Sequence, residues 1–327
     1  MHARMRRTVW FLGLLISNAA CAHGLKATAA TSNPSVASRE VIEPPATNYP
    51  ATEFAKVAVL QWTHRDFAPM PATTAQAEAY KAINRADLTE YIVQAKRQGA
   101  ELIMTPEFGV TGYPETADGE HQFKAPEEVA PYVETIPGPS TQYFGELSQR
   151  LGIWIGFSLA EKGADGNYYN AAVLVDAEGK VRLVHRKRNL FGSERKFLKA
   201  GQDAQVIETP FGRMGMMICA DVYHSATLND FKKRAPESVL VSAAWTVHDS
   251  AVHSFRAAAR TLGSTVVASN LADFPDSGVF NGDGSTQSHI RETKGLAFGY
   301  LKRQRRGNEG ELKGIPIRAS RSAYYSR

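Results

Sequence analysis

The sequence predicts one α/β domain in which helices cover β-sheets that pack on one another. Apolar runs typical of strands alternate with amphipathic helical stretches, and several strand candidates follow one another closely as hairpins. With 327 residues, of which 43% are hydrophobic and 22% charged, the chain can bury one large core or two modest ones. No internal repeat or second linker interrupts the pattern, so we expect one folded unit.

The predicted elements follow from periodicity and from helix-end signals. Strands are expected at 56–62, 101–107, 153–161, 170–179, 181–186, 238–244 and 264–270, with a hairpin-like pair over 204–219. Helices are expected at 76–100, 140–152 and 250–263. Gly99 is expected to end the first helix, and Ser140 to act as the N-cap of the second. A connecting loop is expected over 189–201.

The N-terminus has the pattern of an export signal. A basic stretch, "MHARMRR", precedes "TVWFLGLLIS", which is too short to span a bilayer as a helix. Ala20-Cys21-Ala22 fits an A-x-A cleavage site before His23. The alternative is a lipoprotein cysteine at Cys21, which is disfavoured because Asn18 stands where an aliphatic residue is expected. We therefore expect a signal peptide at 1–22 and a periplasmic or extracellular protein, with a membrane tether through Cys21 as the alternative.

Residues 23–52 are rich in Ala, Ser, Thr and Pro and have no apolar period, so they predict a flexible leader ahead of a folded domain at 53–327. The formal net charge of +5 is mild for this length. The basic run 300–314 lacks the interleaved aromatic residues of a nucleic-acid platform and predicts a solvated loop, with an anionic partner as the alternative. We expect the protein to bind no nucleic acid and the mature chain to contain no membrane span.

The mature chain is expected to keep a single cysteine. An exported protein meets oxidising conditions, yet Cys219 has no second cysteine to pair with once Cys21 is removed or lipidated. Such a thiol is either a buried, inert small hydrophobe or a residue kept for its nucleophilicity. Its position at the end of the apolar run "MGMMI" allows both readings.

Three polar residues lie at the ends of predicted strands, where α/β scaffolds collect their active sites. Glu107 follows "LIMTP", Lys187 follows "VRLVHR", and Cys219 follows "MGMMI". Together they suit acyl transfer, in which the carboxylate takes the thiol proton, the thiolate attacks a C–N carbon, and the ammonium offsets the oxyanion. Each residue taken alone also has a non-catalytic explanation: Glu107 as a surface charge, Lys187 as one of several cations, and Cys219 as a core residue.

At these residues the sequence resembles the nitrilase superfamily of carbon-nitrogen hydrolases. The segments "LIMTPEFGVTGYP", "LVHRKRNLF" and "GMMICADVYH" are similar to its three motifs, and the resemblance extends from about Lys56 to "GELKGIPI". It implies a single-domain α-β-β-α sandwich at 53–327 and a Glu-Lys-Cys triad at Glu107, Lys187 and Cys219. It also implies a second glutamate, which falls on Glu161 and is expected to hold Lys187 or the substrate in place.

The resemblance has further implications for the site. It implies that the backbone N–H of Ala220 joins Lys187 in holding the oxyanion, that a thioester forms, and that no metal or organic cofactor is used. The nine histidines show no metal-ligand spacing such as H-E-x-x-H. The expected partners are a small-molecule amide substrate and a second copy of the chain in a homodimer or larger assembly.

Departures from the commonest family pattern bear on the substrate. Ala220-Asp221 after the cysteine, in place of Trp-Glu, favours amides over nitriles. The segments "SAAWTVHDS", "RAAARTLGSTVVASN" and "FNGDGSTQSHI" resemble the exported biotinidase and pantetheinase group, which favours a secondary amide. A carbamoyl or primary amide substrate or a nitrile is the alternative, and an N-acyltransferase or a non-catalytic binding protein is the alternative of another class.

Candidates for the acyl-side wall of the pocket follow the same strands. Besides Phe108, they are Tyr113, Asn189, Tyr223 and Trp245. Each of these side chains is equally suited to core packing.

Overall fold

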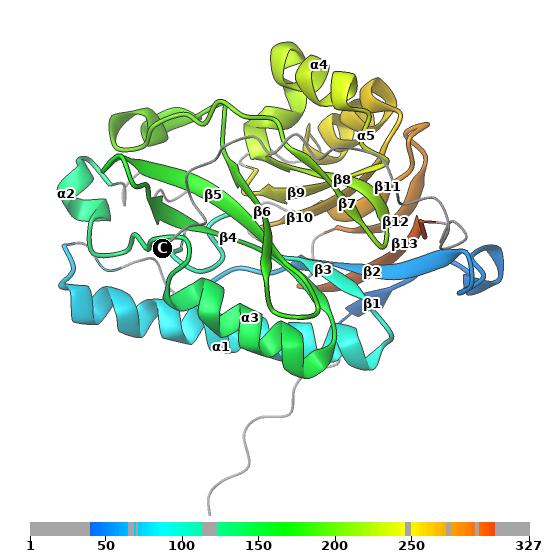
Figure 1. Ribbon diagram of the computed structural model, residues 1–327, viewed down its shortest axis with the longest axis horizontal. Coiled ribbons are helices and arrows are strands. Elements are labelled where there is room, and N and C mark those ends of the chain that lie inside the picture. Colours follow the sequence, from blue (N-terminus) through cyan, green and yellow to red (C-terminus); the bar gives the residue numbers. More distant parts are fainter. Residues whose placement is uncertain are drawn as a thin grey trace, which may run out of the picture. The chain divides into compact units, whose positions relative to one another are not determined.

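The computed structural model describes residues 40–64, 69, 71–112, 123–245, 250–272, 276–291 and 294–304. In this part of the chain, strands form two sheets with the orders β1-β13-β2-β3-β4-β5-β6 and β12-β11-β10-β9-β8-β7 (Figure 1). The first sheet contains β1 (Glu40–Ile42), β2 (Phe54–Gln61), β3 (Leu102–Met104), β4 (Trp154–Lys162), β5 (Tyr168–Val175), β6 (Val181–Arg186) and β13 (Gly295–Lys302). The second contains β7 (Val206–Thr209), β8 (Gly212–Ile218), β9 (Ser238–Ala243), β10 (Thr265–Asn270), β11 (Ser277–Phe280) and β12 (Thr286–Ile290).

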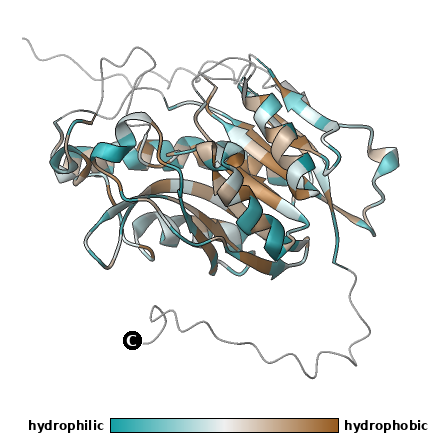
Figure 2. Ribbon diagram, turned by 90° about the horizontal axis from the view of Figure 1, so that it is seen from above, coloured by the Kyte–Doolittle hydropathy of each residue, from teal (hydrophilic) through white to brown (hydrophobic). Residues whose placement is uncertain are grey.

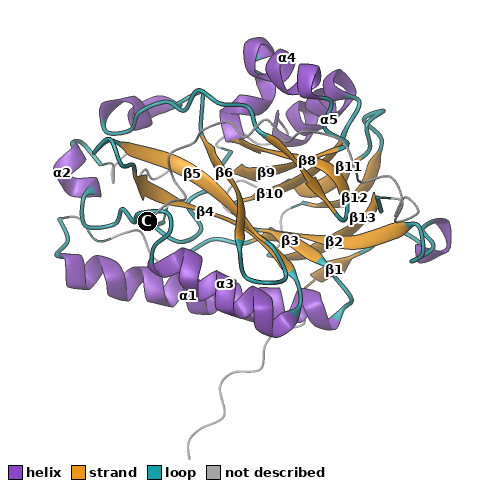
Figure 3. Cartoon of the chain, in the orientation of Figure 1, coloured by secondary structure: helices purple, strands orange, loops and turns teal. Residues whose placement is uncertain are grey.

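The helices cover the outer faces of the two sheets. They are α1 (Thr74–Arg97), α2 (Pro126–Val129), α3 (Pro139–Leu151), α4 (Ser225–Arg234) and α5 (Ser250–Leu262), with 3-10 turns η1 (Ala46–Asn48), η2 (Gly192–Lys196) and η3 (Cys219–Tyr223). Figure 3 shows α1 and α3 against the seven-stranded sheet and α4 and α5 on the side of the six-stranded sheet. The predicted α-β-β-α sandwich is therefore confirmed.

Both faces of the central strands are buried. Along β2, Val57 and Val59 belong to the core between the sheets, whereas Ala58 and Leu60 pack against α1 and α3, as expected because alternate strand residues point to opposite faces. Figure 2 shows the resulting concentration of hydrophobic residues in the strands, with hydrophilic residues on the outer turns of the helices. No helix in the described ranges has both the length and the apolar character needed to cross a bilayer.

Most predicted elements are present with small shifts at their ends. The strand at 181–186 coincides with β6, and α1 ends before Gly99, whose φ of +87° suits a glycine that follows a helix. The N-cap prediction at Ser140 is wrong, because α3 already begins at Pro139 with Gly138 as its N-cap. The backbone N–H of Ser140 instead donates to Glu134 Oε2 at 2.8 Å.

Several elements were not predicted. They are β1, the helices α2 and α4, and the strands β11, β12 and β13. The predicted leader at 23–52 differs from the structure in its last part, because Glu40–Ile42 pair in parallel with Gly295–Ala297 of β13 and η1 follows. A three-residue strand has too few residues to show a period. The predicted signal peptide and the start of the leader lie outside the described residues.

Candidate active site

Cys219 lies where β8 ends and η3 begins. Its φ of +43° is uncommon for a residue with a side chain, so the turn holds the thiol in a conformation that the surroundings must enforce. The side chain is buried, and Sγ lies 3.9 Å from the carbonyl oxygen of Ala244. Burial raises the pKa of the thiol, the charge of Glu107 raises it further, and the charge of Lys187 opposes the rise. The resting residue is therefore a thiol that needs a base to become a nucleophile.

Glu107 is fixed between the two sheets. It follows β3, and its backbone N–H donates to the carbonyl of Ala243, at the end of β9 in the other sheet, at 3.3 Å. Its Oε1 accepts hydrogen bonds from Lys187 Nζ (2.8 Å) and Asn170 Nδ2 (2.7 Å). Its Oε2 is buried and has no hydrogen-bond partner among the described residues. One carboxylate oxygen is thus anchored, and the other is available for a proton.

The environment of Glu107 changes its acidity. Burial raises its pKa to about 7, although the charge of Lys187 opposes the rise, and the charge of Glu194 adds to it. A carboxyl group with this pKa exchanges protons near neutral pH, as a general base must.

Lys187 follows β6 and is fully buried. Its backbone N–H donates to the carbonyl of Asn170 at 2.8 Å, and its Nζ donates to Glu107 Oε1 and Glu194 Oε2, both at 2.8 Å. The carboxylates of Glu107 and Glu194 thus hold the side chain of Lys187 in a fixed position.

Glu194 is a site residue that the sequence interpretation missed. It lies in η2, seven positions after Lys187, inside the loop predicted at 189–201, and it is buried. Its Oε2 also accepts a hydrogen bond from the backbone N–H of Phe191 at 2.7 Å, which closes the loop around the carboxylate. An acidic residue shortly before the apolar pair Phe197-Leu198 was the available signal, because that pair draws the loop into the core.

Glu161 does not occupy the position that the resemblance gave it. It accepts hydrogen bonds from Arg186 Nε (2.7 Å) and Nη2 (2.5 Å). Arg186 and Lys187 are consecutive at the end of an extended strand, so their side chains point to opposite faces. Glu161 therefore lies on the Arg186 side, and the second carboxylate on Lys187 belongs to Glu194.

Asp221 ties the lysine loop to the cysteine turn. Its Oδ1 accepts hydrogen bonds from the backbone N–H groups of Arg188 (3.1 Å) and Asn189 (2.9 Å) and from Asn189 Nδ2 (2.9 Å). Its Oδ2 accepts from the backbone N–H of Ile218 (3.1 Å) and lies 2.8 Å from His185 Nε2. The second partner of Asn189 Nδ2 is Thr227 Oγ1, at 2.7 Å. The amide group of Asn189 thus joins the lysine loop to the cysteine turn and to α4.

The aromatic candidates do gather beside the cysteine. The rings of Tyr223 and Trp245 meet edge to face with centroids 5.6 Å apart, and the backbone N–H of Trp245 donates to Asn270 Oδ1 at 2.9 Å. Tyr223 ends the 3-10 turn that Cys219 begins, and burial raises the pKa of its hydroxyl group. Tyr223 is 46% exposed and therefore faces a side open to solvent. Tyr113 lies outside the described residues.

The amide of Ala220 lies in the first turn of η3, where backbone N–H groups have no partner within the helix. Ala220 itself is buried directly beside the thiol. Its N–H is therefore suitably placed in the chain to donate to an oxyanion formed at Cys219.

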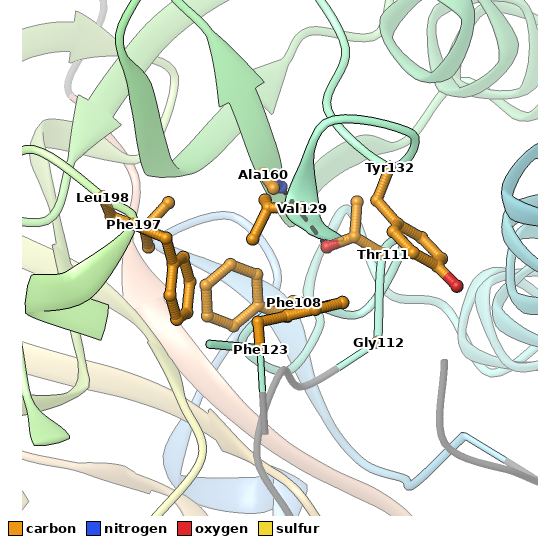
Figure 4. A pocket seen from close by; sticks show the side chains of 9 residues that line it. All are labelled: Phe108, Thr111, Gly112, Phe123, Val129, Tyr132, Ala160, Phe197 and Leu198. Carbon is orange, nitrogen blue, oxygen red and sulfur yellow. Dashed lines mark hydrogen bonds between the residues drawn. The ribbon is translucent and has the colours of Figure 1, made fainter. Parts of the chain in front are cut away.

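An apolar cluster packs behind the two glutamates. Figure 4 shows Phe108, Phe197 and Leu198 around a small cavity that is also lined by Phe123 and other side chains. Phe108 follows Glu107, and the other two follow Glu194, so one cluster fixes both carboxylate loops and keeps water away from them. The cavity is about 10 Å³, too small for more than a single water molecule.

The described residues contain no group of three or more His, Cys, Asp or Glu side chains that could hold a metal ion. The site thus offers a buried thiol, a carboxyl group whose pKa is about 7, and an ammonium group held in a fixed position. The family model for carbon-nitrogen hydrolases matches residues 56–262. The chain belongs to the carbon-nitrogen hydrolase family.

Relatives of this carbon-nitrogen hydrolase include two enzymes from Bos taurus. Pantetheinase is 30% identical over 230 residues, which are 59% of this chain and 43% of pantetheinase. Omega-amidase NIT2 is 25% identical over 193 residues, which are 54% of this chain and 64% of that enzyme. The chain thus spans about half the length of the curated relatives it matches.

Solved structures of the same fold confirm the nitrilase-superfamily architecture. An amidase from Nesterenkonia sp. has a TM-score of 0.61 at 21% identity, and Nit3 of Saccharomyces cerevisiae, described as a member of branch 10 of the nitrilase superfamily, has a TM-score of 0.62 at 18% identity. Each alignment covers 76% of this chain and 90% of the other.

Proposed function

We propose that this carbon-nitrogen hydrolase is a thiol amidohydrolase that cleaves a non-peptide amide bond through an acyl-enzyme on Cys219. The observation that carries the proposal is the free oxygen of Glu107. Its Oε1 is held by Lys187 and Asn170, while Oε2 is buried without a partner among the described residues. An unpaired buried acceptor is costly, so its retention beside a thiol that needs a base points to proton transfer.

In the proposed first half-reaction, Glu107 Oε2 takes the proton of Cys219, and the thiolate forms a bond to the carbonyl carbon of the amide. The oxyanion that results is stabilised by Lys187 Nζ and the N–H of Ala220. Glu107 then gives its proton to the amine nitrogen as the C–N bond breaks, and a thioester remains on Cys219.

In the second half-reaction, Glu107 takes a proton from a water molecule, whose oxygen attacks the thioester carbon. The tetrahedral intermediate collapses to the carboxylic acid, and the proton returns to Cys219. Lys187 stays charged throughout, with Glu194 holding it in place.

The proposed substrate is a secondary amide. Support comes from the Ala220-Asp221 sequence after the cysteine and from the similarity to pantetheinase. The similarity to omega-amidase NIT2 and to the Nesterenkonia amidase also favours an amide over a nitrile. One form of that amidase is described as showing covalent addition of the acetamide moiety of fluoroacetamide at the active site cysteine, which is the kind of adduct proposed for Cys219.

The proposal is tested by incubating the protein with a mixture of secondary amides, primary amides, carbamoyl compounds and nitriles. Mass spectrometry then identifies the compounds consumed, and intact-protein mass spectrometry after rapid acid quench detects the acyl-enzyme. Added amine acceptors separate a hydrolase from an N-acyltransferase, since a transferase forms a new amide. Absence of turnover and of any adduct on Cys219 across all four classes would refute the amidohydrolase.

We also propose that the enzyme is exported, on the strength of the signal-like residues 1–22, and that it forms a homodimer. N-terminal sequencing of protein purified from the periplasm or medium tests the cleavage before His23. A diacylglyceryl group on Cys21 would instead show that the exported enzyme is tethered to a membrane. Light scattering tests the dimer.

A further inference from the structure

We propose that Asn170 is a positioning residue that bridges the two buried glutamates and holds Glu107 ready for proton transfer with Cys219. This inference rests on the proposed function of the site. Asn170 lies on β5 and is fully buried.

The contacts of Asn170 close a ring of hydrogen bonds. Its Nδ2 donates to Glu107 Oε1 at 2.7 Å and to Glu194 Oε1 at 2.8 Å. Lys187 Nζ donates to Glu107 Oε1 and to Glu194 Oε2, both at 2.8 Å. Each carboxylate is therefore bound by the same two donors, an ammonium on one side and an amide on the other.

This ring solves an electrostatic problem. Two carboxylates that share a buried site repel each other, and a single lysine neutralises only one of the two charges. The two N–H groups of the asparagine amide supply one neutral donor to each carboxylate, without adding a titratable group. Because both donors meet Oε1 of Glu107, they also fix which oxygen of that carboxylate remains open.

The side-chain amide of Asn170 is oriented so that both of its hydrogens point at the two glutamates. With Nδ2 toward the carboxylates, Oδ1 is buried and has no hydrogen-bond partner among the described residues. The opposite orientation would place the amide oxygen against two carboxylates, so it is excluded by repulsion. The asparagine thus accepts the free-energy cost of one unpaired acceptor in order to direct both hydrogens at the glutamates.

The prediction concerns the pH at which Glu107 loses its proton. The groups that act on Glu107 are Lys187 and Glu194 together with the hydrogen bond from Asn170, and Cys219 is charge-coupled to it. The hydrogen bond from Asn170 stabilises the charged carboxylate, so its loss raises the pKa of Glu107 above about 7. The acid limb of every reaction that needs this base should then move to higher pH.

The experiment measures two pH profiles for the full-length protein. One is kcat/KM for an amide substrate, and the other is the rate of carboxamidomethylation of Cys219 by iodoacetamide, followed by peptide mass spectrometry, which needs no substrate. Asn170→Ala should move the acid limb of both profiles upward by about one pH unit with KM within about twofold of wild type. The isosteric Asn170→Asp, which adds a third carboxylate, should move it further and slow alkylation at pH 7 by more than about tenfold.

Asn84→Ala is the matched control, because Asn84 is also buried but donates only to the main chain, at Val110 O (3.0 Å). It should lower stability without moving either profile. Unchanged acid limbs in both Asn170 variants would overturn the proposal, as would a raised KM with unchanged kcat, which would mean that Asn170 contacts the substrate. If no amide is turned over by wild type but the alkylation profiles shift as stated, the ring survives and the amidohydrolase proposal fails.

Discussion

Replacing Asp221 by asparagine should destabilise the protein strongly, although the side chain keeps its shape. Asp221 is fully buried and has five hydrogen-bonding partners, three on Oδ1 and two on Oδ2. With the new oxygen facing the three donors, the new NH2 group faces the backbone N–H of Ile218 and His185 Nε2. The hydrogen bond from Ile218 N–H is then lost and the bonds to the other oxygen lose their charged acceptor, which costs about 2–4 kcal/mol of the free energy of unfolding.

Urea unfolding at pH 7.5, buffered identically for each variant, measures this loss as a midpoint lowered by roughly 1 M. The control is Asp230→Asn. Asp230 has a side chain that is 42% exposed, and its Oδ2 lies 2.8 Å from Arg188 Nη2. The unfolding midpoint of this variant should stay close to that of wild type, because an exposed ion pair adds little to stability. An Asp221→Asn variant that unfolds at the wild-type midpoint would refute the reasoning.

The same interaction gives a pH dependence with a definite sign. Burial acts to raise the pKa of Asp221, but its hydrogen bonds and the charge of His185 outweigh this and hold the pKa below 3.8. The stabilisation is therefore present above pH 3.8 and is lost as the pH falls through the folded-state pKa. The difference between wild type and Asp221→Asn should shrink on acidification below pH 4, as measured by urea midpoints at successive pH values.

Three further outcomes are expected. Cys219→Ser and Cys219→Ala should lose nearly all amide turnover while circular dichroism shows an intact fold; near-normal hydrolysis by the alanine variant would end the nucleophile proposal. Glu194→Gln should lower kcat by about a hundredfold or more, because it removes a charge that holds the ammonium of Lys187. Glu161→Gln should keep kcat within about tenfold of wild type; a larger loss in Glu161→Gln than in Glu194→Gln would restore Glu161 as the second catalytic glutamate. Wild-type kcat/KM should fall below about pH 7 as Glu107 becomes protonated, and Glu107→Gln should abolish this acid limb along with most of the activity.

The sequence predicted the elements that carry long apolar patterns. The strands that became β2, β4, β5 and β9 are buried along nearly their whole length, which makes their hydrophobic runs visible without any tertiary information. In contrast, β12 is a five-residue polar strand whose stability comes from pairing with β11 and from contact with β13, both of which depend on the folded chain. The helix α4 buries only Thr227, Leu228 and Phe231, too narrow a stripe to be read from its sequence.

Among the site residues, position in the chain was easier to predict than direction in space. Glu107, Lys187 and Cys219 follow strands, and strand ends meet at one edge of a sheet. Glu161 lies near the end of β4, and whether its carboxylate reaches Lys187 or Arg186 depends on which face each side chain occupies after folding. Glu194 lies in a loop, and loops lack the hydrophobic periodicity that marks inward-facing side chains in strands and helices.

The backbone hydrogen bond between Glu107 and Ala243 has a consequence for how the enzyme would lose activity. Glu107, Lys187 and Asn170 are carried by one sheet and Cys219 by the other, so the reacting groups face each other across the seam of the sandwich. No fraying of a single helix or loop can separate them; that requires the two sheets to slip, which exposes the shared core. Thermal inactivation should therefore coincide with global melting. Core substitutions far from the thiol should change activity by altering the spacing between the two sheets.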